Sequence, residues 1–102
     1  MRKCKIIISD LANTNTLILD EEKNVCLYNN IQRDENVELL LCQIEDVISE
    51  QPNEENKYLI VDGVEIEIYF IDNERKIQYK LNLNNAPKAC SKICKIMEGI
   101  NG

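Results

Sequence analysis

Five cysteines are the residues with the most obvious chemical potential in this 102-residue chain: Cys4, Cys26, Cys42, Cys90 and Cys94. Their number is odd, and their spacing fits neither a disulfide framework nor a zinc ribbon. Cys90 and Cys94 are spaced to share a helix face, but the sequence has no histidine to complete a tetrahedral zinc site with them. A thiolate nucleophile needs an imidazole or an electropositive neighbour, and only Lys92 and Lys95 are near Cys94 in sequence. We therefore expect reduced, buried thiols and neither a metal ion nor a cofactor.

The other candidates for chemistry are Glu65 and Glu67, which would project from one face of a strand. A pair of carboxylates can catalyse the hydrolysis of glycosides. The spacing of Glu65 and Glu67, two residues apart, is also that of ordinary alternating polar residues on a solvated sheet. General acid–base work near neutral pH often uses histidine, which is absent. The three glycines, Gly63, Gly99 and Gly102, form no phosphate-binding loop. The sequence thus predicts no catalytic residue and a protein that is not an enzyme.

Residues 56–84, which contain this glutamate pair, predict a three-stranded antiparallel meander. Residues 57–61 favour a strand, and Asp62-Gly63 favours a two-residue turn that sets Val61 opposite Val64. A second strand over 64–71, a loop over 72–75 and a third strand over 77–83 follow. On one face, the expected pairs are Val64 with Leu83, Ile66 with Leu81, Ile68 with Tyr79 and Phe70 with Ile77. On the other face they are Glu65 with Asn82, Glu67 with Lys80 and Tyr69 with Gln78.

The rest of the chain predicts the same kinds of element. A strand at 6–8 precedes a hairpin made by 16–19 and 25–28 around the turn 20–24. Asp34 is the expected N-cap of a helix that reaches Glu50, and Asn85 the expected N-cap of a second helix with Pro87 in its first turn. The order βββα-βββα predicts one α+β domain over 1–102, an antiparallel sheet with both helices on one side and the other face open.

The two halves also resemble each other, which suggests an internal duplication of 1–50 and 53–102. At an offset of 52 without gaps, 9 of 50 aligned pairs are identical, against roughly four expected by chance. Strand falls on strand and helix on helix. Coincidence in a chain rich in Ile, Asn and Glu is the alternative.

Charge narrows the class of partner. The net charge is −6, and residues 1–52 carry ten acids against five bases. The first predicted helix contributes Glu38, Glu45 and Asp46 without a lysine or arginine. Such a chain repels phosphates, which argues against direct nucleic-acid binding, and favours a larger protein with a basic surface. A solvated face that maintains solubility is the alternative.

The open face of the meander is a second candidate surface. Tyr58, Ile60 and Tyr69 lie there among Glu65 and Glu67, so that apolar anchors stand within a polar rim. Inert surface and a homodimer contact are the alternatives.

These features predict a small acidic binding protein that neutralises a larger partner by occluding its basic surface. An immunity protein against a nuclease toxin and a phage-encoded inhibitor of a bacterial defence nuclease both fit. The alternatives are a ligand-binding domain or enzyme with a pocket between sheet and helices, and a homodimeric adaptor. The N-terminus shows no signal-peptide core and no stretch predicts a membrane span, so we expect a cytoplasmic protein.

Overall fold

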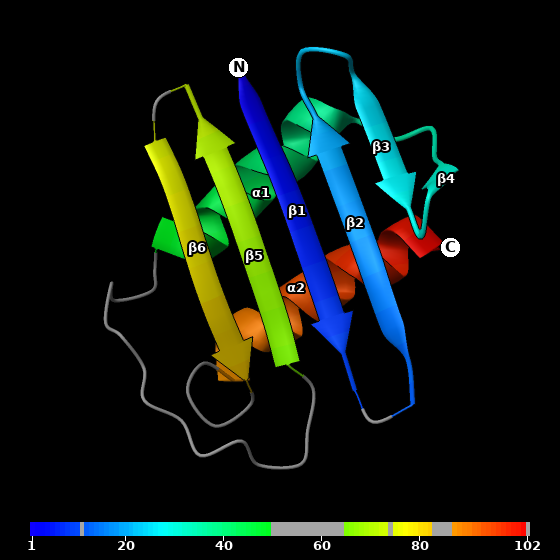
Figure 1. Cartoon of the computed structure of the whole chain (residues 1–102), viewed down its shortest axis with the longest axis vertical. Helices are drawn as coiled ribbons and strands as arrows, with labels where there is room; N and C mark the ends of the chain where they lie inside the picture. The colour runs from blue at the N-terminus through cyan, green and yellow to red at the C-terminus, as the bar shows by residue number, and fades with distance from the viewer. Residues whose placement is uncertain (11, 50–64, 74, 83–86, 102) are drawn as a thin grey trace.

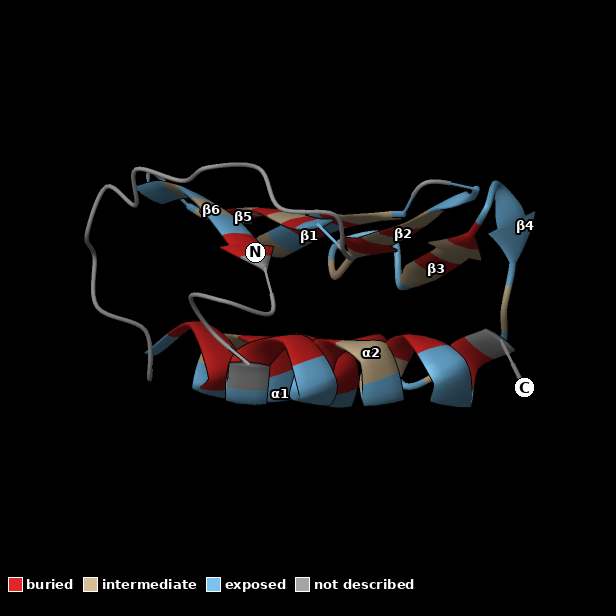
Figure 2. Cartoon of the chain, turned by 90° about the horizontal axis from the view of Figure 1, so that it is seen from below, coloured by how far each residue is buried: buried red, intermediate tan, exposed pale blue. Residues whose placement is uncertain are grey.

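The computed structural model describes residues 1–10, 12–49, 65–73, 75–82 and 87–101. Its elements are β1 (Arg2–Ser9), β2 (Thr14–Asp20), β3 (Val25–Tyr28), β4 (Ile31–Gln32), α1 (Val37–Ser49), β5 (Glu65–Asp72), β6 (Arg75–Asn82) and α2 (Pro87–Asn101). The strands form one antiparallel sheet in the order β4-β3-β2-β1-β5-β6. Both helices pack side by side on the same side of this sheet and run in opposite directions (Figure 1, Figure 2). The predicted α+β architecture is therefore confirmed.

The first strand, β1, lies at the centre of the sheet. It pairs with β2 on one side and with β5 on the other. Cys4 and Ile6 alternate inward and are buried, and Ile6 lies opposite Ile68 of β5. The predicted strand over 57–61 lies outside the described residues, but the place predicted for it beside β5 is occupied by β1. An alternating apolar strand far away in sequence can supply the same pairing surface as an adjacent one.

The two hairpins follow the sequence closely. In β5–β6 the observed pairs include Ile66 with Leu81, Glu67 with Lys80, Ile68 with Tyr79, Tyr69 with Gln78 and Phe70 with Ile77, as predicted. The strands extend further than expected, to Asp72 opposite Arg75, and Asn73 between them has a φ of 53°. Asparagine tolerates this left-handed conformation, which a tight hairpin turn requires. The β2–β3 hairpin is also confirmed, with Asp20 opposite Val25.

The start of α1 differs from the prediction. The N-cap is Asn36, whose Oδ1 accepts a hydrogen bond from the backbone N–H of Leu39 at 3.1 Å. The backbone N–H of Arg33 donates to the carbonyl oxygen of Cys26 at 2.8 Å, which keeps the chain beside the sheet at the point where Asp34 was expected to begin the helix. Asparagine caps as well as aspartate does, so the sequence alone does not choose between the two. The second expected cap, Asn85, lies outside the described residues.

The core lies between the sheet and the two helices, and the buried residues of the helices lie on the side that faces the sheet (Figure 2). The side chains that are most completely buried include Ile6, Leu17, Leu41, Ile44, Ile66, Ile68 and Ile93. The apolar residues that recur at helical spacing are buried as the sequence predicts, except that Ile96 is only half-buried: Val37, Leu40, Leu41, Ile44, Val47 and Ile48 in α1, and Ala89, Ile93, Met97 and Ile100 in α2. Within the described residues, no helix has the length and apolar character needed to cross a membrane.

Candidate functional site

The predicted partner-binding residues lie on two separate sides of the molecule. Glu65, Glu67 and Tyr69 belong to β5 and point to the open face of the sheet, whereas Glu38, Glu45 and Asp46 belong to α1 beneath the other face. Tyr58 and Ile60 lie outside the described residues. The molecule measures 38 × 31 × 18 Å, so one partner would have to reach around its short dimension to contact both sets. They are therefore two distinct candidate surfaces.

The open face of the sheet is apolar in part and nearly balanced in charge. It is formed by the side chains of β1, β2, β3, β5 and β6 that alternate away from the helices. Its apolar members are Ile7, Ile18, Val25, Leu27, Tyr69 and Ile71, most of them half-buried. Its charged members are Lys3, Lys5, Lys76 and Lys80 against Asp20, Glu65 and Glu67. Among the residues that the structure describes, this face therefore has no excess of negative charge to match a basic partner surface.

Tyr69, the predicted aromatic anchor, is held against the sheet. Its hydroxyl donates a hydrogen bond of 2.8 Å to Oε2 of Glu67, two residues away on the same strand, so the ring lies along β5. This bond raises the pKa of the Tyr69 phenol, because the carboxylate stabilises the protonated form. Oε1 of Glu67 lies 3.9 Å from Nζ of Lys80, which agrees with the predicted pairing of these two residues. Glu67 thus has partners on both of its carboxylate oxygens.

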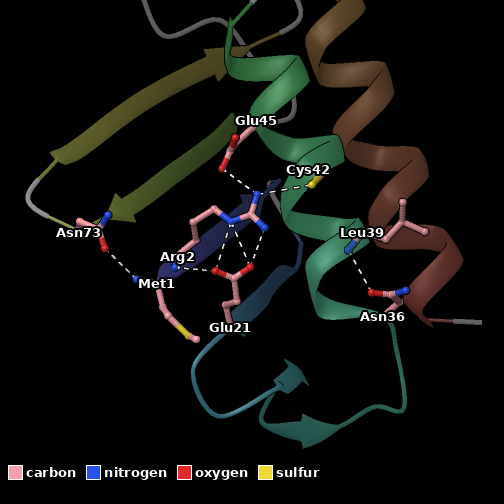
Figure 3. A network of polar contacts seen from close by, with 8 residues as sticks. All are labelled: Met1, Arg2, Glu21, Asn36, Leu39, Cys42, Glu45 and Asn73. Atoms are coloured by element: carbon pink, nitrogen blue, oxygen red, sulfur yellow. Dashed lines mark hydrogen bonds and ion pairs between the residues drawn. The ribbon is translucent and has the colours of Figure 1, made fainter.

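The second surface is an edge of the molecule where the turn between β2 and β3 meets α1 (Figure 3). Arg2 lies at its centre, with a side chain that is only 16% exposed. Its Nη2 lies 2.6 Å from Oε2 of Glu21, and its Nη1 lies 3.0 Å from Oε1 of Glu45 and 3.4 Å from Sγ of Cys42. Its backbone N–H also donates to Oε1 of Glu21 at 3.1 Å. One guanidinium therefore ties β1 to the turn and to α1.

Arg2 also affects the charge of this edge. The hydrogen bonds from Arg2 hold the pKa of the Glu21 carboxyl below its usual range, so Glu21 stays ionised in mildly acidic solution. Glu38 lies one helical turn before Cys42 and on the same row of α1 as Glu45. Glu21 and Glu22 of the turn after β2 and Glu38 and Glu45 of α1 together form what we call the acidic edge, and Arg2 contacts two of these four carboxylates, Glu21 and Glu45. Its net charge of −3 makes it the surface that matches the predicted partner.

Sequence reasoning missed the role of Arg2, although a signal for it existed. Every second residue of β1 faces the helices, and Arg2 lies two residues before the buried Cys4 and four before the buried Ile6, so it faces the same way. A cation at an inward position near the end of a strand requires an acidic partner from a neighbouring element.

Asp46, the third predicted acid of α1, lines an open groove between α1 and α2 with a volume of about 550 Å³. A smaller hollow of about 250 Å³ lies between the end of α1 and the β5–β6 hairpin, and Glu45, Ser49, Asp72, Arg75 and Tyr79 contribute its polar lining. The hollow corresponds to the pocket that the ligand-binding alternative predicts, and it is smaller than the roughly 300–1,000 Å³ typical of small-molecule sites.

The cysteines are all free. Cys4, Cys26 and Cys90 are buried as predicted, and burial raises the pKa of the Cys4 thiol to about 12 and that of Cys90 to about 11. Cys94 is half-buried, and the prediction is wrong for Cys42, which is exposed because it lies on the row of α1 that faces Arg2 instead of the core. No group of three or more metal-ligating side chains occurs in the part of the chain that the structure describes.

Comparison of the chain with protein-family models, with curated proteins and with solved structures finds no match.

Proposed function

We propose that this protein binds a larger protein by covering a basic surface on it, and that the acidic edge is the contact. Occlusion of this kind requires a compact body and complementary charge, and it requires no catalytic residue. A nuclease toxin or a bacterial defence nuclease is a suitable partner class, because such enzymes line their substrate-binding surfaces with lysine and arginine.

The arrangement around Arg2 is the observation that supports this proposal. The guanidinium is turned inward and shared between Glu21 and Glu45, which fixes the turn between β2 and β3 against α1. Glu22, next to Glu21 in the turn, and Glu38, one helical turn before Cys42 in α1, are both exposed. Acidic groups held on a rigid support lose little conformational entropy on binding and steer a basic partner to one orientation.

The experiment uses purified protein and a panel of nuclease toxins and nucleic-acid-guided defence nucleases. We expect a one-to-one complex with one member, detected by calorimetry and by loss of nuclease activity, that weakens as salt concentration rises. The double substitution Glu22→Lys and Glu38→Lys should weaken binding by about tenfold or more for each reversed charge.

Glu65→Lys is the matched control for Glu22→Lys or Glu38→Lys alone, because each of the three reverses one charge, and Glu65 does so at an exposed position on the open face of the sheet. The proposal is wrong if no member of the panel binds, or if Glu65→Lys weakens the complex as strongly as the double substitution does.

The hollow beside α1 supports a second candidate, a small ligand-binding domain. Its lining offers Arg75 and the carboxylates of Glu45 and Asp72 together with the hydroxyls of Ser49 and Tyr79, which suit a small zwitterionic metabolite. In a metabolite screen, a ligand would raise the melting temperature, and Arg75→Ala would abolish that rise without lowering the melting temperature of the free protein.

A further inference from the structure

The groove between α1 and α2 has an apolar floor that remains open on the outer side of the helix layer. Leu40 and Val47 contribute to it from α1, and Ile96 and Ile100 from α2. Gly99 also lines it, and a Cβ placed on this glycine would meet no atom within 4 Å. The groove therefore has room for a side chain from another molecule.

A leucine stands beside this groove. Leu39 is 53% exposed, whereas the other aliphatic residues of α1 are all buried. It lies four residues before Gln43 and seven before Asp46, and both of these line the groove, so Leu39 occupies the same row of the helix at the rim. In Figure 3 its side chain leaves α1 on the side where α2 runs.

The two rims of the groove carry opposite charges. Glu35 and Asp46 lie on the α1 side, and Lys92 and Lys95 on the α2 side. A two-fold axis along the groove places α1 of one molecule over α2 of another, so that the acidic rim of each faces the basic rim of the other. The surface is thus complementary in charge to a second copy of itself.

We infer that two copies of this chain associate through their helix layers, with Leu39 of each copy in the groove of the other, close to Gly99. Every contact is made twice, because the interface is isologous. The acidic edge and the open face of the sheet both remain outside, so the dimer presents two acidic edges. This inference is independent of the proposed function.

Sedimentation velocity of the purified protein over a concentration range from about 1 to about 500 µM tests the inference. We expect a concentration-dependent dimer. Leu39→Glu should shift the protein to monomer across this range, because it places a charge in the apolar groove. Ile31→Glu is the control, since Ile31 is 59% exposed on β4 and does not line the groove, and it should leave the dimer intact.

A second experiment distinguishes contacts between molecules from contacts within one. Asp46→Lys and Lys95→Glu should each weaken the dimer when present alone, because like charges then face each other. An equimolar mixture of the two variants should restore dimer, since both contacts across the mixed dimer are then complementary.

A wild-type protein that stays monomeric over the whole range overturns the inference. So does a dimer that survives Leu39→Glu, or a mixture of the two charge variants that remains monomeric. Circular dichroism of each variant establishes that the fold is retained.

Discussion

Arg2 shows how one side chain joins the two layers of this protein. Its guanidinium contacts Glu21 and Glu45, and a charge-assisted hydrogen bond to a carboxylate is roughly twice as strong as a neutral one. The three residues belong to β1, to the turn after β2 and to α1. The charges on the acidic edge are therefore positioned by the same contact that fixes the turn against the helix.

Replacement of Glu21 by glutamine should lower the free energy of unfolding at neutral pH. The pKa of Glu21 is lowered in the folded protein, so the unfolded chain binds more protons than the folded one as pH falls. The stabilisation is complete above the unfolded carboxyl pKa and is lost as pH falls through the lowered folded pKa. Urea unfolding measured from about pH 7 to about pH 2 should show the difference between wild type and Glu21→Gln shrinking on acidification.

Glu22→Gln is the control for this experiment, because Arg2 bonds to Glu21 and not to its neighbour. A difference between Glu21→Gln and wild type that stays constant down to the lowest pH would contradict the role assigned to Arg2.

For single residues, the sequence predicted the face of the sheet on which a side chain lies better than it predicted the residue to which that side chain bonds. Alternation placed Glu67 opposite Lys80 and Tyr69 on the same face, since these follow from the period of a strand. The bond between Tyr69 and Glu67, and the choice of Asn36 over Asp34 as helix cap, depend on rotamers and on local chain path. Neither the bond nor the cap can be predicted from the spacing of apolar residues in a strand or helix.

Among the elements, the β5–β6 hairpin was predicted most completely, because a one-residue slip would turn its apolar face to water. The strand that pairs with the other side of β5 was not predicted correctly, because hydrophobic alternation identifies a strand without specifying which strand pairs with it. The sequence favoured 57–61 for its proximity, and β1 has the place instead.

The two faces of β5 provide a stability test with matched residues. Ile68 is fully buried against the helices, whereas Ile71 is 36% exposed on the open face. We expect Ile68→Ala to cost about 3 kcal/mol in the free energy of unfolding, because it leaves a cavity in the core. Ile71→Ala should cost less than about 1 kcal/mol, as measured by urea unfolding. Equal costs would mean that the faces of β5 have been assigned wrongly.

For the whole molecule, the main finding is that the negative charge is unevenly distributed. The sequence predicted an acidic first half, and the structure brings Glu21 and Glu45 of that half together at Arg2, while lysines of β1 and β6 lie on the open sheet face. The separation of the predicted binding residues onto two sides was not foreseeable, because it depends on which layer each element joins.

The suggested duplication remains a prediction, and the structure adds one complication. At an offset of 52, β2, β3 and α1 fall on β5, β6 and α2. The faces do not correspond, because the buried residues Leu17 and Leu19 fall on Tyr69 and Ile71, which point to the open face. A gap of one residue in the alignment of the strands would restore the match.

Thiol chemistry reports on the integrity of the whole fold. In native buffer a thiol reagent should modify Cys42 at least about a hundredfold faster than Cys4, because Cys42 is exposed while Cys4 is buried with a pKa of about 12. Cys42→Ser should remove the fastest phase, and urea should make all remaining thiols reactive at similar rates. Rapid modification of Cys4 in native buffer would contradict the packing described for β1.

The central place of β1 has a consequence for synthesis on the ribosome. β1 leaves the exit tunnel before β5, and one of its two hydrogen-bonding sides stays unpaired until β5 follows. The residues of β5 pair with it across as many as 70 positions of sequence, from Arg2 to Asp72. Until then the nascent chain presents an unpaired apolar strand edge, a known starting point for aggregation. Such distant pairing also slows folding. Chaperone demand during translation should therefore be set by the time the ribosome takes to reach the second half of the message.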